Sequence, residues 1–348
     1  MYVLVAAEIF LRVFHPIPML PRYVTAKPYG VRGNMPGARF WHRTPEYELE
    51  MRMNSHGVRA DEEIPYEKPE HELRVLLLGD SFAVGHGATV EQTFLSQTQD
   101  ALHADGIDVQ VVNMGVSGHG TAEQLVTLRE EGLRYEPDLV VVGWHPTDLD
   151  DNVRSNLFAF ENGELEARSE VYLPAVSTRT FLFSFAAYRW LAGSSHLYNW
   201  VRTEGGQAGQ RLLFMIRSVG SGGDRPDAER EEGGGPDGAP GELSPAEQLT
   251  LALLREMRRV SEESGASFMI VDIPYRRPGP SYVSGFPPDP AGAHHGFVFV
   301  DPIPVFEEHI DELLYWERSH DHFTPRGNRL VGREMARTIQ REGLLPRP

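Results

Sequence analysis

The feature that most constrains the fold is a series of short apolar runs that begins at residue 74. The runs cover residues 74–78, 109–112, 139–144, 267–273 and 297–300, and helical patterns separate them. Short continuous apolar runs are typical of strands buried on both faces of a parallel sheet. Strands that alternate with helices predict right-handed crossovers, with helices on both faces of the sheet. The sequence therefore predicts a three-layer α/β/α domain.

Helix-capping pairs mark where several of the intervening helices begin. Three pairs fit the capping box, in which two side chains satisfy free N–H groups of the first turn: Thr89 with Gln92, Thr121 with Gln124, and Ser244 with Glu247. They predict helices from 89 to about 103, from 121 to about 132 and from 244 to 265. A last helix is expected from Pro325 to about 340, and residues 180–200 are expected to form one or two helices.

The chain of 348 residues divides into an N-terminal extension, 1–73, and a domain, 74–348. Residues 220–241 contain 8 glycines and 3 prolines among scattered charges, so they are expected to be a flexible insert. Residues 1–14 are apolar apart from Glu8 and Arg12, and they lack the basic start of a signal peptide. Two interpretations stay open: a short helix packed on the domain, or the end of a truncated membrane anchor.

Composition narrows the classes of function. The formal net charge is −17, which argues against binding to nucleic acid or to an anionic membrane, because both need a basic surface. The chain has no cysteine, so disulfides, thiolate metal sites and a cysteine nucleophile are excluded.

Polar segments follow three of the predicted strands. Residues 79–82 (GDSF), 113–121 and 145–152 each come directly after an apolar run. In open α/β sheets, ligands bind at the edge where the carboxyl ends of the strands meet. Ser81 is therefore either a nucleophile at this edge or a serine that caps a helix. A fourth polar segment, 320–328, precedes the last helix.

Together these segments resemble the SGNH hydrolases, also called GDSL esterases. The resemblance is carried by residues 79–82, 113–118, 147–148 and 322–325, and it extends from about 74 to the C-terminus. More distantly, Glu8, Arg12 and residues 54–59 resemble a subgroup with an N-terminal membrane anchor and an extracytoplasmic catalytic domain. The resemblance implies a flavodoxin-like sheet and a serine hydrolase that needs neither metal nor cofactor.

The resemblance also implies roles for particular residues. Ser81 would attack an ester carbonyl, and His322 would be the general base that accepts its proton. The backbone N–H groups of Ser81 and Gly118 would stabilise the oxyanion. In the family, an asparagine side chain is a third donor, and an aspartate two or three residues before the histidine orients the imidazole.

This chain departs from that pattern at two places. Thr147 stands at the asparagine position, where its hydroxyl is either a substitute donor or uninvolved. His320 and Ser319 stand where the aspartate is expected. Asp321 is adjacent to His322, and neighbours on an extended backbone point to opposite sides, so Asp321 reaches the ring only if the loop bends. Otherwise the site is a Ser–His dyad, or it takes a carboxylate from elsewhere.

Other polar residues have simpler interpretations. His320, Asp321 and His322 form only a fragment of a metal site, so no metal is expected. His86, His119 and His145 are expected to line the site or to form local hydrogen bonds, and Asp148 to shape its own loop. Residues 275–277 either line the substrate pocket or belong to a solvated loop. His294 and His295 are expected to lie in a solvated loop.

The function predicted from the sequence is serine-dependent hydrolysis of a carboxylic ester, with O-acetyl groups on a carbohydrate as the favoured substrate. An O-acyltransferase of envelope polysaccharide and a non-catalytic member that binds a glycan or a partner are the alternatives. The resemblance favours the cell envelope or periplasm, with membrane association through a truncated N-terminus. A complete N-terminus would favour the cytoplasm.

Overall fold

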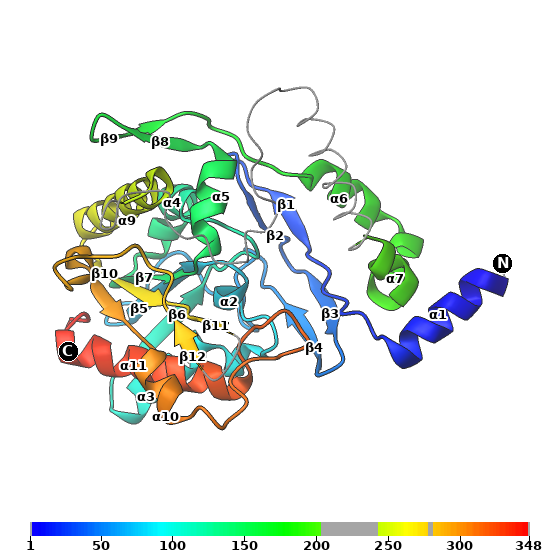
Figure 1. Cartoon of the computed structure of the whole chain (residues 1–348). Coiled ribbons are helices and arrows are strands. Elements are labelled where there is room, and N and C mark those ends of the chain that lie inside the picture. The colour runs from blue at the N-terminus through cyan, green and yellow to red at the C-terminus, as the bar shows by residue number, and fades with distance from the viewer. Residues whose placement is uncertain (1, 203–242, 278–280, 347–348) are drawn as a thin grey trace.

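The structure is a computed structural model that describes residues 2–202, 243–277 and 281–346 (Figure 1). The predicted flexible insert, 220–241, lies outside the described residues. The division of the chain at residue 74 stays a prediction.

A parallel sheet of five strands forms the centre, in the order β13-β10-β7-β5-β6. Its strands are β5 (Leu73–Gly79), β6 (Val109–Asn113), β7 (Leu139–Trp144), β10 (Ser267–Asp272) and β13 (Val298–Val300). All four pairings are parallel, which confirms the predicted α/β fold. The chain passes from β5 to β6 on one side and then to β7 on the other. The strand order thus reverses at β5, and such switch points are where open α/β sheets bind ligands.

Helices cover both faces of this sheet (Figure 1). One face carries α4 (Thr121–Glu130), α5 (Thr147–Ser155) and α9 (Pro245–Glu263), and the other carries α3 (Phe94–Ala104), α10 (Ile303–Glu308) and α11 (Pro325–Glu342). Leu76 and Leu78 point to the first group, and Val75 and Leu77 to the second. All four are buried, which explains why the strand is a continuous apolar run.

Two of the three predicted capping boxes form. The backbone N–H of Ser244 donates to Glu247 at 2.7 Å, and the Glu247 N–H donates to Ser244 Oγ at 3.3 Å. The Thr89 box also forms, but it opens a 3₁₀ turn over Val90–Gln92 rather than the helix. The extended backbone of Thr93 interrupts the run, and Thr93 caps α3 instead.

The predicted capping box of Thr121 and Gln124 is wrong, although the helix itself forms. Thr121 Oγ1 and Gln124 Nε2 both donate to Asp148 Oδ2, at 2.9 and 3.2 Å. Asp148 is fully buried on α5, and a buried carboxyl group is costly unless donors reach it. Tertiary hydrogen bonds have therefore replaced the local cap.

The N-terminal segment forms α1 (Tyr2–Phe14) and two antiparallel hairpins that the sequence did not predict. These are β1 (Val24–Ala26) with β2 (Arg32–Asn34), and β3 (Arg39–Arg43) with β4 (Glu48–Arg52). Val31, Val58 and Ile64 are buried in the core beside the central sheet. The segment is therefore part of the packed body.

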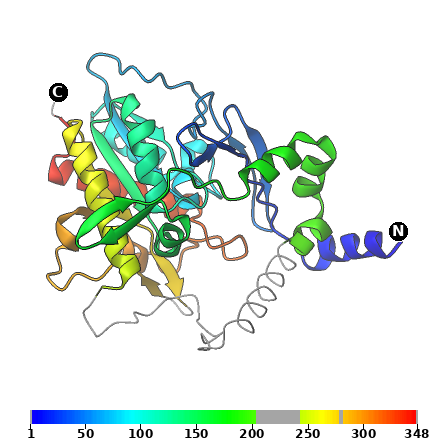
Figure 2. The same ribbon diagram turned by 90° about the horizontal axis from the view of Figure 1, so that it is seen from above.

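Helix α1 projects from that body (Figure 2). Leu11 is its only buried residue among those described, and its exposed large apolar side chains are Tyr2, Val3, Leu4, Val5, Ile9, Phe10, Val13 and Phe14. Within the described ranges, no helix has the length and apolar character needed to cross a membrane.

The remaining elements lie around the sheet. The segment 180–200, predicted as one or two helices, contains parts of three: α6 (Val176–Ser184), α7 (Ala186–Ser194) and a helical run that begins at residue 196. Two further antiparallel hairpins are β8 (Phe158–Glu161) with β9 (Glu164–Ala167), and β11 (Tyr275–Arg277) with β12 (Ser281–Val283).

The packing of α11 on α3 predicts the effect of adding one methyl group. A Cβ at Gly332 would lie 2.6 Å from the Phe94 carbonyl oxygen and 2.7 Å from Gln97 Cβ. We expect Gly332→Ala to lower the free energy of unfolding by about 1–3 kcal/mol, because the backbone of α3 cannot yield. Gly193, on α7, has open space around it. Gly193→Ala should raise the unfolding free energy by about 0.5–1 kcal/mol. Urea denaturation measures both, and unchanged stability of Gly332→Ala would refute this packing.

Candidate active site

Ser81 lies at the carboxyl end of β5, where it begins the short helix α2 (Ser81–Val84). The carboxylate of Asp80 accepts a hydrogen bond from the Phe82 N–H at 2.8 Å and so caps this helix. A Cβ at Gly79 would lie 2.6 Å from Ala83 Cβ and 2.9 Å from the Gly143 carbonyl oxygen. The turn therefore needs a glycine, and it presents Ser81 at the point where the strand order reverses.

The loop after β6 packs against α2. Asn113 Nδ2 donates to the Ala83 carbonyl at 2.7 Å, and Asn113 Oδ1 accepts from the Gly115 N–H at 3.0 Å. Gly118 follows in this loop with φ +78°. The backbone N–H groups of Ser81 and Gly118 donate to no residue within the described part of the chain. Two unused donors thus lie at the same end of the sheet as the Ser81 hydroxyl.

His322 completes a hydrogen-bonded pair with Ser81. Its Nε2 lies 2.8 Å from Ser81 Oγ, and only 7% of the residue is exposed. Phe82 stacks on the imidazole with ring centroids 4.6 Å apart. Burial lowers the pKa of His322 to about 3, and the neighbouring His320 and His145 contribute to this shift. The ring is therefore neutral at pH 7, and its Nε2 can accept the serine proton.

The structure does not bring Asp321 to the imidazole. His320 and Asp321 both have left-handed backbones, with φ +64° and +49°. This bend turns the Asp321 side chain outward, where it is 63% exposed and 3.9 Å from Arg276. The other imidazole nitrogen, His322 Nδ1, is buried without a hydrogen-bond partner in the described structure.

A carboxylate from the N-terminal segment holds the loop that carries His322. Glu46 lies in the turn between β3 and β4, and its Oε2 accepts from Ser319 Oγ at 2.6 Å and from the Arg318 N–H at 2.8 Å. Ser319 is fully buried. Trp316 fixes the same loop, since its Nε1 donates to the Gly87 carbonyl at 3.0 Å. Sequence reasoning missed Glu46, because a pairing over 273 residues leaves no local pattern.

Thr147 and His145 form a local pair at the end of β7. Thr147 is exposed, and its Oγ1 lies 2.9 Å from His145 Nδ1. The Thr147 backbone N–H also donates to Nδ1, at 3.3 Å. We therefore assign Nδ1 as an acceptor and place the ring proton on Nε2. The His145 ring stacks on Phe82 with centroids 5.0 Å apart, and burial lowers its pKa to about 4. His145 is thus a neutral N–H donor beside the residue that follows Ser81.

The other histidines near the site have local roles. His119 is buried, and its Nε2 donates to the Arg32 carbonyl at 2.8 Å. His86 packs between His42 and His322, with ring centroids 4.6 and 5.0 Å away. Within the described ranges, no three His, Asp or Glu side chains are arranged to hold a metal ion.

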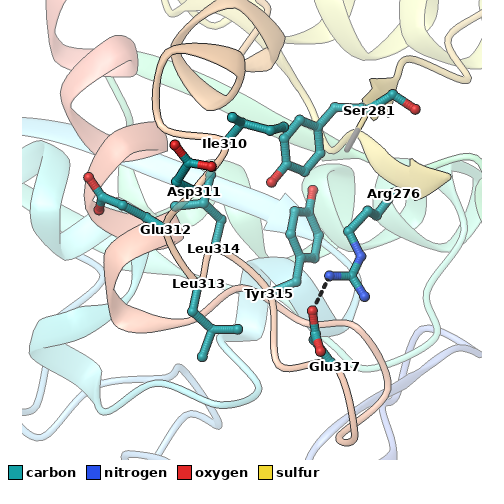
Figure 3. Close-up of a pocket in the computed structure, with 10 residues that line it drawn as sticks. Arg276, Ser281, Ile310, Asp311, Glu312, Leu313, Leu314, Tyr315 and Glu317 are labelled. Carbon is teal, nitrogen blue, oxygen red and sulfur yellow. Dashed lines mark hydrogen bonds and ion pairs between the residues drawn. The ribbon is translucent and has the colours of Figure 1, made fainter. Parts of the chain in front are cut away.

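A pocket of about 380 Å³ lies between the β11–β12 hairpin and the loop 310–317 (Figure 3). Tyr315 lines it, and Arg276 pairs with Glu317 across its edge at 2.5 Å. Neither Ser81 nor His322 lines this pocket. The structure therefore places Arg276 in a cavity separate from the Ser81–His322 pair.

The chain is similar to one curated arylesterase, over a short stretch, and to several solved structures. No family model matches the chain. A stretch of 69 residues is 36% identical to an arylesterase from Vibrio mimicus, and it covers 20% of this chain and 34% of the arylesterase. The chain thus matches about a third of that curated relative. Similar solved structures include TesA, at 14% identity over 77% of this chain and 98% of that chain, with a TM-score of 0.39.

Two further solved structures are similar. One is a lipase/acylhydrolase from Enterococcus faecalis, at 15% identity over 79% of this chain and 99% of that chain, with a TM-score of 0.37. The other is a catalytic mutant of an acetylxylan esterase from Geobacillus stearothermophilus. It is 16% identical over 79% of this chain and 97% of that chain, with a TM-score of 0.30. The comparisons do not support the membrane-anchored subgroup, and that part of the resemblance stays a prediction.

The Glu46 contacts predict how the loop responds to loss of this carboxylate. Glu46→Ala should lower the free energy of unfolding by about 1–3 kcal/mol, because it leaves the buried Ser319 hydroxyl without a partner. Amide exchange over 316–322 should become faster. Glu48→Ala is the control, since Glu48 lies on the same hairpin but pairs with Arg43 at the surface. Equal exchange in the two variants would contradict a tethering role for Glu46.

Proposed function

We propose that this chain is a carboxylic ester hydrolase in which Ser81 is the nucleophile and His322 the general base. The observation that carries the proposal is the 2.8 Å contact between Ser81 Oγ and His322 Nε2 at the switch point of the sheet. As Oγ attacks the ester carbonyl, Nε2 takes the hydroxyl proton. His322 then gives that proton to the leaving alcohol oxygen, which leaves the acyl group on Ser81.

Hydrolysis of the acyl-enzyme completes the cycle. A water molecule attacks the acyl carbonyl while His322 takes one of its protons, and the carboxylic acid leaves as the proton returns to Ser81 Oγ. In both steps the carbonyl oxygen becomes an oxyanion. The backbone N–H groups of Ser81 and Gly118 are the proposed donors to it, and the Nε2–H of His145 is the proposed third donor in place of the Thr147 hydroxyl.

The proposed mechanism is a Ser–His dyad. No carboxylate meets His322 Nδ1 in the described structure, so the imidazolium formed during attack lacks a paired anion. A missing acid reduces turnover without abolishing it. We propose that the hydrogen bond from Ser319 to Glu46 helps to hold His322 in position. In a Ser–His–Asp triad, the carboxylate bonded to the histidine has that role.

The proposed substrate class is an O-acetylated carbohydrate, as the sequence resemblance implies. An acyltransferase would use the same serine and histidine but pass the acyl group to a sugar hydroxyl instead of water. A non-catalytic member would keep the cleft and bind a glycan or a partner without turnover. Reaction with a fluorophosphonate in the absence of ester turnover would favour the transferase, and no reaction would favour the binding protein.

Turnover of p-nitrophenyl acetate tests the proposed pair. Ser81→Ala and His322→Ala should each abolish hydrolysis to a similar degree, because the two groups act as a unit. Neither change should move the melting temperature by more than a few degrees. If either variant keeps more than about a tenth of the wild-type turnover, the assignment of that residue is wrong.

A second pair of variants tests the third oxyanion donor. His145→Ala should lower kcat by about 10²–10³-fold, the scale of one lost donor. KM should change little, since the oxyanion exists mainly in the transition state. Thr147→Val removes the hydroxyl, keeps the backbone N–H bond to His145, and should have the smaller effect. The opposite order would assign the donor to Thr147, which is one of the two alternatives that the sequence leaves open.

A further inference from the structure

Two arginines from outside the central sheet lie beside Gly118, and a third comes from the helix that packs beside β1. Arg22 precedes β1, Arg32 lies on β2 and Arg179 lies on α6, which packs beside β1 (Figure 1). A Cβ at Gly118 would lie 3.3 Å from Arg22 Nη1 and 3.4 Å from Arg32 Nη2. Two guanidinium groups therefore lie directly against the loop whose N–H is a proposed oxyanion donor.

Arg32 is the structural member of this group. Its Nε and Nη2 donate to the two carboxylate oxygens of Glu123 at 3.1 and 3.2 Å, and Nη2 also donates to the Gly118 carbonyl. Arg32 and Glu123 are both buried. Their charges thus compensate each other, and the pair fixes the position of the Gly118 loop.

Arg22 and Arg179 lack such compensation. Arg22 forms no hydrogen bond or ion pair with any residue that the structure describes, and its side chain reaches solvent. Arg179 Nη1 is buried without a hydrogen-bond partner. An arginine with a structural role is paired, as Arg74 is through three backbone carbonyls at 3.0 Å and Glu72 at 2.7 Å.

The unpaired charges lie within electrostatic reach of the reacting residues. Although Arg22 is exposed, the protein atoms packed around its guanidinium lower its pKa to about 10, and the charges of Arg179 and Arg32 add to the shift. The Arg22 charge in turn lowers the pKa values of Asp80 and His322, which flank Ser81 in space. Two nearby carboxylates, Glu123 and Asp80, already accept hydrogen bonds from Arg32 and from the Phe82 N–H.

A local excess of positive charge stands out in this chain, because the chain as a whole is strongly acidic. With a net charge of −17, the surface as a whole repels anions. The positive charge of Arg179 acts on Arg22 across the solvent-accessible space beside Gly118, and a bound anion would offset that repulsion. Guanidinium groups match the geometry of carboxylate, sulfate and phosphate oxygens.

We infer that Arg22 and Arg179 form a subsite for a negatively charged oxyanion group on the substrate, an inference that rests on the proposed ester hydrolysis. The substrate class is then an ester whose acyl or alcohol part also carries a carboxylate, sulfate or phosphate. For a carbohydrate ester, this means an acidic sugar rather than a neutral one.

Two matched pairs of esters test the subsite and locate the charge. p-Nitrophenyl hydrogen succinate carries a carboxylate on the acyl part, and its methyl ester replaces that charge with a neutral group. p-Acetoxybenzoate and its methyl ester differ in the same way on the alcohol part, and the rates of spontaneous hydrolysis correct for differences in reactivity within each pair. The wild type should show kcat/KM about tenfold higher for the charged member of one pair at low salt, and the preference should shrink as salt is added.

The variants assign the preference to the subsite. Arg22→Gln should bring the charged-to-neutral ratio towards one, and Arg22→Lys should keep part of it. Arg337→Gln removes the same charge from an exposed position on α11 and should leave the ratio unchanged. No preference in the wild type for either pair, or an unchanged ratio in Arg22→Gln, would overturn the inference.

A binding measurement separates this inference from the proposed function. Calorimetry on Ser81→Ala should show tighter binding of the charged member of the preferred pair than of its methyl ester, and adding Arg22→Gln should remove the difference. If the wild type turns over no ester but this difference is present, the proposed function fails and the subsite stands. If charged and neutral members bind equally, the subsite is refuted.

Discussion

The hydrogen bond between Ser81 Oγ and His322 Nε2 joins residues 241 positions apart, and the rest of the site depends on it. Ser81 is fixed by a glycine turn at the end of β5, in the middle of the sheet. His322 lies on the loop between α10 and α11 rather than at the end of a strand of the sheet. The loop holds its place through Trp316, which reaches Gly87, and through Glu46, which reaches Ser319. The N-terminal segment is therefore needed for the geometry of a pair to which it contributes neither atom.

Burial has two opposite effects on His322 as the general base of this pair. It keeps His322 neutral, so the imidazole is ready to accept a proton at pH 7, but it also disfavours the imidazolium that attack creates. Among the residues that the structure describes, no anion lies at His322 Nδ1 to offset that cost, and the charge of Arg22 adds to it. An anionic group on the substrate, bound near Arg22, would reduce the positive potential at His322. Substrate binding and general-base catalysis would then be coupled through the same arginine.

The structural features that the sequence predicts are those that depend on patterns of residues close together in the chain. The strands of the central sheet are continuous apolar runs because both faces are covered, and Ser81, Gly118 and His322 follow from short motifs placed after strands or before a helix. The capping box of Thr121 and Gln124 could not be rejected locally, because the competing acceptor, Asp148, lies on another helix. The strands of the hairpins β1–β4 have only three to five residues, so even the alternation of charged and apolar residues in β4 is too short to predict a strand. Glu46 acts through a partner distant in the sequence, and Arg22 lies beside a loop that is distant in the sequence, so no spacing rule identifies either residue.

The most direct test of the account is to locate the residue that a fluorophosphonate modifies in the full chain. The reagent bonds covalently to an activated serine oxygen and releases fluoride, so peptide mass spectrometry identifies the site without knowledge of the natural substrate. The account predicts a single adduct on Ser81, formed much more slowly in His322→Ala, where the hydroxyl has lost its base. An adduct on a different serine, or a rate on Ser81 that does not change when His322 is removed, would contradict it.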